Sequence, residues 1–136
     1  MVKCYLGYYK EAAEHFEEAA RYFESHMSEN IHPNLKLNNE SGYFNSIYRL
    51  STCYKNLHLY RKEDSLITIG LERLQNTSEL SIEYGYFQKG KGVQLLKAGK
   101  SDEALTHLEL SQDILLHNQD YASLNTVYFY LGKLRS

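Results

Sequence analysis

Glutamates near the start of the chain form the densest group of side chains that could carry out acid–base chemistry. They lie one helical turn or less apart, at Glu11, Glu14, Glu17 and Glu18. A catalytic carboxylic acid has to be shielded from water so that its pKa rises toward neutrality. These glutamates instead alternate with lysine and arginine on one polar stripe. We therefore interpret them as the solvated face of a helix.

Two glycine–lysine sequences share features with phosphate-binding loops. Gly90-Lys91-Gly92 falls inside a helical pattern, and Gly99-Lys100-Ser101 lacks the GxxxxGK frame that follows a strand. The GxSxG motif of a nucleophilic serine is absent from the sequence as well. The sequence therefore predicts that this chain is not an enzyme.

Cysteine and histidine do not occur at the spacings of metal ligands. Cys4 and Cys53 are far apart, and no HExxH pair occurs among the six histidines. We expect no metal and no cofactor. The first residues lack the apolar run of about 7 to 15 residues found in signal peptides, and no window approaches the roughly 18 apolar residues of a membrane span. The chain is expected to be cytoplasmic.

Composition limits the size of the fold and the kinds of partner. The chain has 136 residues, which predicts one domain over 1–136. Lys and Arg number 15 against 17 for Asp and Glu, and 43% of residues are hydrophobic. This balance is typical of a globular domain and excludes a strongly basic surface on average. We expect neither direct nucleic-acid binding by this segment nor membrane association.

Apolar residues recur at intervals of three and four along most of the chain, which predicts helices and no strands. The expected segments are about 8–26, 40–58, 60–74, one that ends at Gly99, one capped by Ser101 and one that starts at Asp120. Residues 26–38 contain the only proline and no sustained periodicity, so we expect a long loop between the first two helices. Gly85, Gly90 and Gly92 would each weaken their helix by about 1 kcal/mol, so they need a packing reason.

A pattern of small, large and small residues repeats along the chain. It occurs at Ala12, Phe16 and Ala19, at Ala104, Leu108 and Ser111, and more weakly at Glu63, Ile67 and Gly70. A second pattern consists of an aromatic or apolar residue, then Leu-Gly, then Tyr. It is matched at Ile47, Leu50, Ser51 and Tyr54, and in part at Tyr128, Leu131 and Gly132. A third copy keeps Gly92 and Leu95 but has Lys91 in the leucine position. Together these patterns resemble the second and first helices of tetratricopeptide (TPR) repeats.

The resemblance implies an all-α, right-handed helical solenoid of about six antiparallel helices. Equivalent positions Ser51, Gly92 and Gly132 are 41 and 40 residues apart, whereas most TPR repeats have about 34 residues. Such long, tyrosine-rich units are similar to the peptide-sensing regulators of bacterial quorum-sensing systems, the Rap phosphatases and their relatives that bind DNA through a helix-turn-helix. The chain opens on a second-type helix and closes in a first-type helix. We therefore expect a fragment of a longer solenoid, or end helices that are covered by self-association.

The resemblance also implies a concave groove lined by fixed positions of the first-type helices. The predicted peptide-binding residues are Asn45, Tyr48, Thr52, Lys55, Asn56, Tyr86, Lys89, Val93, Lys97 and Phe129, with Leu96, Thr126 and Lys133 at further groove positions. Amides can pair with a peptide backbone, tyrosines offer flat contact area, and lysines can receive acidic groups. Most other tyrosines, including Tyr54 and Tyr128, are expected to pack between helices. The competing interpretation is that these are ordinary surface residues.

The function predicted from the sequence is a peptide- or protein-binding TPR module that acts in protein–protein interaction. We expect it to be the sensor part of a bacterial transcription regulator, with an acidic peptide or a protein partner in the groove. The alternative is a non-catalytic scaffold or oligomerisation segment, in which the end helices associate with another subunit or with a second copy as a homodimer.

Overall fold

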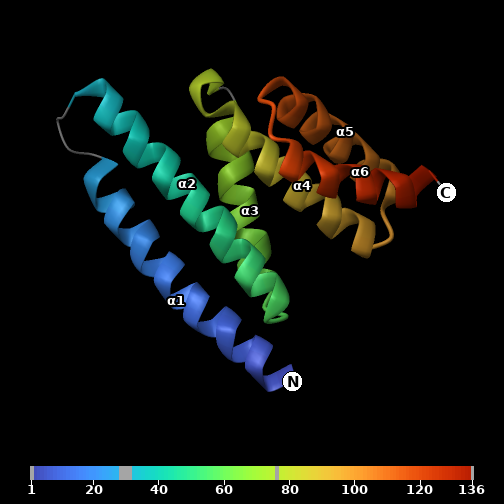
Figure 1. The fold of residues 1–136 in the computed structure, drawn as a ribbon, viewed down its shortest axis with the longest axis horizontal. Helices are drawn as coiled ribbons and strands as arrows, with labels where there is room; N and C mark the ends of the chain where they lie inside the picture. Colours follow the sequence, from blue (N-terminus) through green and yellow to red (C-terminus); the bar gives the residue numbers. More distant parts are fainter. Residues whose placement is uncertain (1, 28–31, 76, 136) are drawn as a thin grey trace. The chain divides into compact units, whose positions relative to one another are not determined.

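The chain is built from helices, as Figure 1 shows. The computed structural model describes residues 2–27, 32–75 and 77–135, and within these ranges it contains no strand. Its elements are α1 (Val2–Met27), α2 (Pro33–Asn56), α3 (Tyr60–Leu74), a short 3-10 helix (Ser78–Leu80), α4 (Ser81–Lys97), α5 (Ser101–His117) and α6 (Tyr121–Arg135). The all-α prediction is confirmed. None of these helices is long and apolar enough to cross a membrane.

Contacts between residues divide the chain into two compact units. Unit 1 is Met1–Gly70 and unit 2 is Leu71–Ser136, so α3 runs from the first into the second. Whether the two form one domain, as the sequence predicts, stays a prediction.

The prediction of a long loop over residues 26–38 is wrong for most of these residues. The first helix continues to Met27, and the second begins at Pro33. Proline suits the first helical position, because its fixed φ is helical and its missing N–H would have no partner there. His32 precedes it as the N-cap, and the imidazole Nδ1 accepts a hydrogen bond from the backbone N–H of Asn34 at 3.1 Å. Residues 28–31 of the predicted loop lie outside the described residues.

Three helix ends turn through the same short corner. α2, α4 and α5 are each followed by a residue in the left-handed region, namely His58 (φ 60°), Gly99 (φ 80°) and Gln119 (φ 59°). Beyond each of them, a backbone N–H bonds to a carbonyl five residues back, as from Lys100 to Leu95 at 2.9 Å. This pattern satisfies carbonyls that a helix end leaves unpaired. The predicted helix end at Gly99 is confirmed, and the chain makes the same corner twice without glycine.

The two predicted N-caps differ in outcome. Asp120 caps α6, because its Oδ1 accepts a hydrogen bond from the backbone N–H of Ser123 at 3.2 Å. The prediction that Ser101 caps α5 is wrong. Ser101 is already helical, and the residue before it, Lys100, makes no capping hydrogen bond with its side chain.

In unit 1, α1 and α2 run side by side in opposite directions (Figure 1). Their shared core contains Ala13, Leu50, Cys53 and Tyr54, with Leu66 of α3 packed against it. The Tyr54 hydroxyl donates to Oε1 of Glu17 at 2.7 Å. Burial, together with this carboxylate, raises the pKa of Tyr54. Tyr54 is therefore the interhelical packing residue that the sequence predicts.

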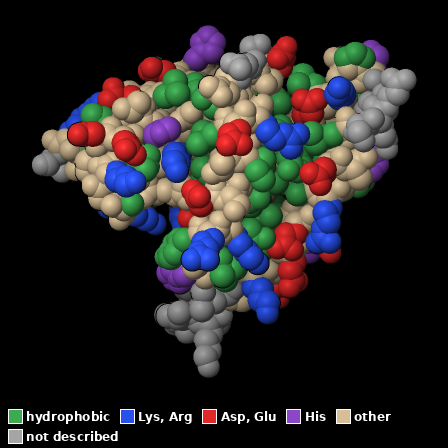
Figure 2. All heavy atoms as spheres, turned by 180° about the vertical axis from the view of Figure 1, so that it is seen from behind, with side chains coloured by type: hydrophobic (Ala, Val, Ile, Leu, Met, Phe, Trp, Pro, Cys, Tyr) green, Lys and Arg blue, Asp and Glu red, His purple; other side chains and the backbone are tan. Residues whose placement is uncertain are grey.

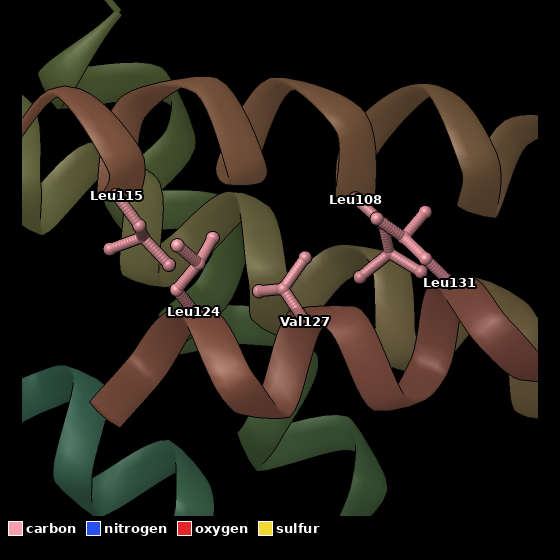
Figure 3. Close-up of a cluster of buried hydrophobic side chains, with 5 residues drawn as sticks. All are labelled: Leu108, Leu115, Leu124, Val127 and Leu131. Carbon is pink, nitrogen blue, oxygen red and sulfur yellow. The ribbon is translucent and has the colours of Figure 1, made fainter. Parts of the chain in front are cut away.

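In unit 2, α5 packs against both α4 and α6. The core between α5 and α6 is built from leucine and valine side chains that point toward one another (Figure 3). Its members are Leu108 and Leu115 from α5, and Leu124, Val127 and Leu131 from α6. All five are at most 2% exposed, so this core holds α6 onto α5.

Close packing against α5 explains two of the glycines inside α4. A β-carbon at Gly92 would lie 2.6 Å from Cγ of Leu108, and one at Gly85 would lie 2.8 Å from Cγ2 of Ile114. The Ser111 hydroxyl also donates to the carbonyl of Gly85 at 2.8 Å. Glycine therefore lets α4 and α5 approach more closely than any other residue would allow.

The pattern of small and large residues marks buried positions in two helices. Ala104, Leu108 and Ser111 of α5 are fully buried. In α3, Glu63 is 5% exposed and Ile67 is 1% exposed. In α1, by contrast, Ala12, Phe16 and Ala19 are only half-buried. In the structure the pattern thus marks buried positions in α3 and α5 and half-buried positions in α1.

Candidate functional site

The five predicted site residues of α2 share one helical face. Asn45, Tyr48, Thr52, Lys55 and Asn56 recur at spacings of three, four and one, and each is half-buried. The opposite face of α2 carries the buried residues Tyr43, Ile47, Leu50 and Tyr54. The helix therefore brings the predicted residues together on the side away from the unit 1 core.

Both predicted amides donate to their own helix. Nδ2 of Asn45 bonds to the carbonyl of Ser41 at 3.0 Å, and Nδ2 of Asn56 bonds to the carbonyl of Thr52 at 2.8 Å. The Thr52 hydroxyl lies 3.4 Å from the carbonyl of Tyr48 in the same way. Each side-chain amide therefore uses at least one of its two N–H donors within its own helix.

Tyr86, predicted to contact a peptide, joins two helices of unit 2. Its hydroxyl donates to Oδ2 of Asp120 at 2.6 Å, and its ring packs against the core that contains Leu108. Burial and the carboxylate raise the pKa of Tyr86, whereas the hydrogen bond from Tyr86 lowers the pKa of Asp120. This bond fixes the start of α6 to α4, so Tyr86 serves packing as well as any surface role.

The remaining predicted residues of α4 differ in exposure. Val93 is 5% exposed and belongs to the interior. Lys97 is exposed in the last turn of the helix. Nζ of Lys89 lies 5.9 Å from the centre of the Tyr86 ring, within the range of a cation–π contact. Of these three, only the lysines are placed to meet a ligand.

The α6 helix presents aromatic side chains to solvent. Phe129 is 58% exposed, and Nζ of Lys133 lies 4.7 Å from the centre of its ring. Tyr128, which the sequence predicts as a packing residue, is 44% exposed, so that prediction is wrong. The helix from Tyr121 to Arg135 contains no acidic residue. Its outer surface is therefore aromatic and basic.

An open groove in unit 1 was not predicted from the sequence. It has a volume of about 440 Å³, and its lining includes Tyr43, Ile47, Leu50 and Leu66. Charged residues Glu17, Arg21 and Glu24 of α1 also line it, and the Arg21 guanidinium lies 3.8 Å from the Glu17 carboxylate. The lining comes from three successive helices, and its residues span positions 17 to 66, so no local motif could indicate it.

A polar pair bridges α4 and α5. Nδ1 of His107 hydrogen-bonds to Oε1 of the buried Gln88. Burial is the main cause that lowers the pKa of His107, and the nearby Lys91 lowers it further. Neutral imidazole is therefore favoured in the folded chain.

The described residues contain no group of three or more His, Cys, Asp or Glu side chains that could hold a metal ion. The Cys53 thiol is buried, and burial raises its pKa, which disfavours the reactive thiolate. On the face that Figure 2 shows, acidic and basic side chains are interspersed, with hydrophobic side chains between them.

Comparisons of the chain with protein-family models, with curated proteins and with solved structures gave no match.

Proposed function

We propose that this chain is a peptide-binding, TPR-like helical module without catalytic activity. In this proposal its helices continue a right-handed solenoid, and unit 2 holds an acidic segment of a peptide or protein across α4 and α6. The observation that carries the proposal is a pair of lysine–aromatic contacts on these two helices, Lys89 with Tyr86 and Lys133 with Phe129.

The packing of unit 2 supports a preformed surface for such a ligand. α4 and α6 contact each other, and the bond between Tyr86 and Asp120 fixes the start of α6 against α4. Both helices also pack on α5. A rigid surface loses little conformational entropy when a ligand binds, which favours affinity.

The chemistry of the surface favours an acidic, partly apolar ligand. Lysine ammonium groups attract carboxylates, and the exposed face of Phe129 can pack against an apolar side chain. Because α6 carries Lys133 and Arg135 but no carboxylate, a basic peptide would meet repulsion on this helix. The module would therefore select by charge and bind by aromatic contact.

The test is a calorimetric titration of an acidic peptide library against the wild type and two variants. We expect Phe129→Ala to weaken binding by about 1 to 3 kcal/mol, because it removes an aromatic anchor. Lys89→Ala should cost less, and its effect should shrink at high salt because salt screens exposed charges.

Tyr121→Ala is the matched control for Phe129→Ala. Tyr121 is also an aromatic residue of α6 and is equally exposed, at 58%, but it occupies no predicted groove position. An equal loss of affinity in both variants, or no loss in either, would contradict the proposed surface.

We further propose that the module is the sensor part of a bacterial transcription regulator. The long, tyrosine-rich repeats support this assignment, because they are similar to those of the peptide-sensing quorum regulators. A helix-turn-helix encoded in the same reading frame would support the sensor role. Further repeats with no DNA-binding part would favour the scaffold alternative.

The scaffold alternative also has a specific observation in its favour. Tyr121, Tyr128 and Phe129 expose large aromatic surface along one helix. Aromatic residues are enriched at protein–protein interfaces, so α6 could serve an assembly rather than a peptide.

A further inference from the structure

The Asp120 carboxylate makes two fixed contacts beside the proposed peptide surface. Its Oδ2 accepts a hydrogen bond from the Tyr86 hydroxyl at 2.6 Å, and its Oδ1 accepts one from the backbone N–H of Ser123 at 3.2 Å. The first bond joins α4 to the residue before α6, and the second caps α6. Because each oxygen has a donor within the chain, the fold sets the position of this negative charge.

The Tyr86 ring places a lysine near this carboxylate. Nζ of Lys89 lies 5.9 Å from the centre of the ring, and the hydroxyl of the same ring bonds to Asp120. Both Lys89 and Asp120 are half-buried, so salt screens their charges less than it screens fully exposed ones. A positive and a negative group thus share one tyrosine between α4 and the start of α6.

The pKa shifts in this cluster have the directions that such an arrangement requires. The hydrogen bond from Tyr86 is the main cause that lowers the pKa of Asp120. Ser123 and the positive charge of Lys89 lower it further. Burial and the Asp120 carboxylate raise the pKa of Tyr86, and the charge of the buried Glu83 adds to that rise. Two carboxyl groups therefore act on the ring that Lys89 contacts.

The second lysine of the proposed surface has different surroundings. Lys133 belongs to α6, which contains no acidic residue. It follows Tyr121, the first residue of α6, by 12 positions, which corresponds to about 18 Å along the helix axis. This separation exceeds the Debye length of about 8 Å at physiological ionic strength. The charge of Asp120 therefore has little effect on a ligand group at Lys133.

We propose that Asp120 determines the charge specificity of the peptide site. Its carboxylate competes with the ligand for Lys89, so an acidic ligand group is disfavoured there and binds at Lys133 and Phe129 instead. The part of the ligand that lies on Tyr86 is then uncharged or basic. The inference rests on the proposed function, because it requires a ligand that spans α4 and α6, and it specifies a peptide with its acidic group at one end only.

The probes are two end-blocked peptides of about seven residues, which span about 20 Å when extended. Both have apolar residues in the middle and glutamate at one end. The other end carries glutamate in the two-acid peptide and glutamine in the one-acid peptide. Calorimetric titration of the wild type should show no tighter binding of the two-acid peptide than of the one-acid peptide.

Asp120→Asn is the decisive variant. It removes the negative charge, keeps a side-chain oxygen that can accept from Ser123, and introduces a residue that caps helices as well as aspartate does. We expect it to bind the two-acid peptide about twofold to fivefold more tightly, the range for release of a partly exposed charge pair. Its affinity for the one-acid peptide should stay unchanged. A role in folding alone would not produce tighter binding.

Matched variants locate the effect. Asp113→Asn removes an exposed carboxylate of α5, a helix outside the proposed ligand surface, and should not tighten binding. The gain from Asp120→Asn should disappear when Lys89→Ala is added and persist when Lys133→Ala is added. A gain that survives without Lys89, or an equal gain in Asp113→Asn, would overturn the inference.

A measurement without ligand tests the charge pair itself. Titration of the Asp120 carboxyl group, followed by NMR, should show a higher pKa in Lys89→Ala than in the wild type, because a positive neighbour has been removed. Lys97→Ala, which changes an exposed lysine in the last turn of α4, should leave this pKa unchanged. An Asp120 pKa that does not respond to Lys89→Ala would overturn the proposed competition.

The outcomes distinguish this inference from the proposed function. Failure of both peptides to bind the wild type and Asp120→Asn would contradict the proposed function, and the inference would fall with it. Binding of the peptides without a gain in Asp120→Asn would overturn the inference alone and leave the peptide site in place.

Discussion

Two glycines of the same helix type should respond in opposite directions to the same substitution. At Gly92, a new methyl group would lie 2.6 Å from Cγ and 2.8 Å from Cδ2 of Leu108. Leu108 is fully buried in the core with Leu131, so it has no free space into which it could move. At Gly132, the same methyl group would meet nothing within 4 Å.

The expected magnitudes follow from two opposing effects. Alanine stabilises a helix interior over glycine by about 1 kcal/mol, whereas an extra methyl group in a packed core costs about 1 to 3 kcal/mol. Because the separation at Gly92 is far below ordinary van der Waals contact, we expect the upper part of that range. Gly92→Ala should therefore lower the free energy of unfolding by about 1 to 2 kcal/mol. Gly132→Ala should raise it by up to about 1 kcal/mol.

The assay is denaturant unfolding, followed by circular dichroism. The linear dependence of the free energy on denaturant gives the stability difference between the two variants. Stabilisation by Gly92→Ala would refute the close approach of α4 and α5. Destabilisation by Gly132→Ala would refute the open face of α6.

Three further predictions test the core and the polar contacts. Leu108→Ala should lower the free energy of unfolding by about 2 to 5 kcal/mol in thermal or chemical unfolding. Phe16→Ala should lower it less, because Phe16 is only half-buried. Equal losses of stability in the two variants would contradict the difference in burial. Tyr86→Phe should lower the free energy of unfolding by about 1 kcal/mol. The hydrogen bond from Tyr86 lowers the pKa of Asp120 from 3.8. The loss of stability in the variant should therefore be present above pH 3.8 and vanish as the pH falls below it. The lowered pKa of His107 means that the unfolded chain binds a proton more readily, so stability should be full above its ordinary pKa of 6.5 and fall as the pH drops below it. Unfolding titrations of His107→Gln should lack that decline, and an unchanged decline would assign it to other groups.

The sequence alone determined the helical class and much of the helix pattern. Apolar spacing of three and four places α3 at 60–74, as observed. Gly99 marks the end of α4 because glycine takes a left-handed backbone conformation without strain. The small and large positions in α3 and α5 also follow from sequence, since close helix packing needs small side chains opposite large ones. The loop at 26–38 failed because the proline starts a helix there, and its role depends on the cap at His32 rather than on composition.

Only the tertiary structure decided which polar and aromatic side chains are exposed to solvent and which bond to another helix. The sequence predicts a peptide contact for Tyr86 and interhelical packing for Tyr128. In the structure Tyr86 bonds to Asp120, a residue 34 positions away, whereas Tyr128 is 44% exposed on α6. The groove that includes Leu66 likewise depends on three helices meeting. The difference between Gly92 and Gly132 is the sharpest case, because both occupy the same repeat position. A sequence pattern specifies which face of a helix can receive a neighbour, but whether a neighbour lies there depends on contacts between residues far apart in the chain.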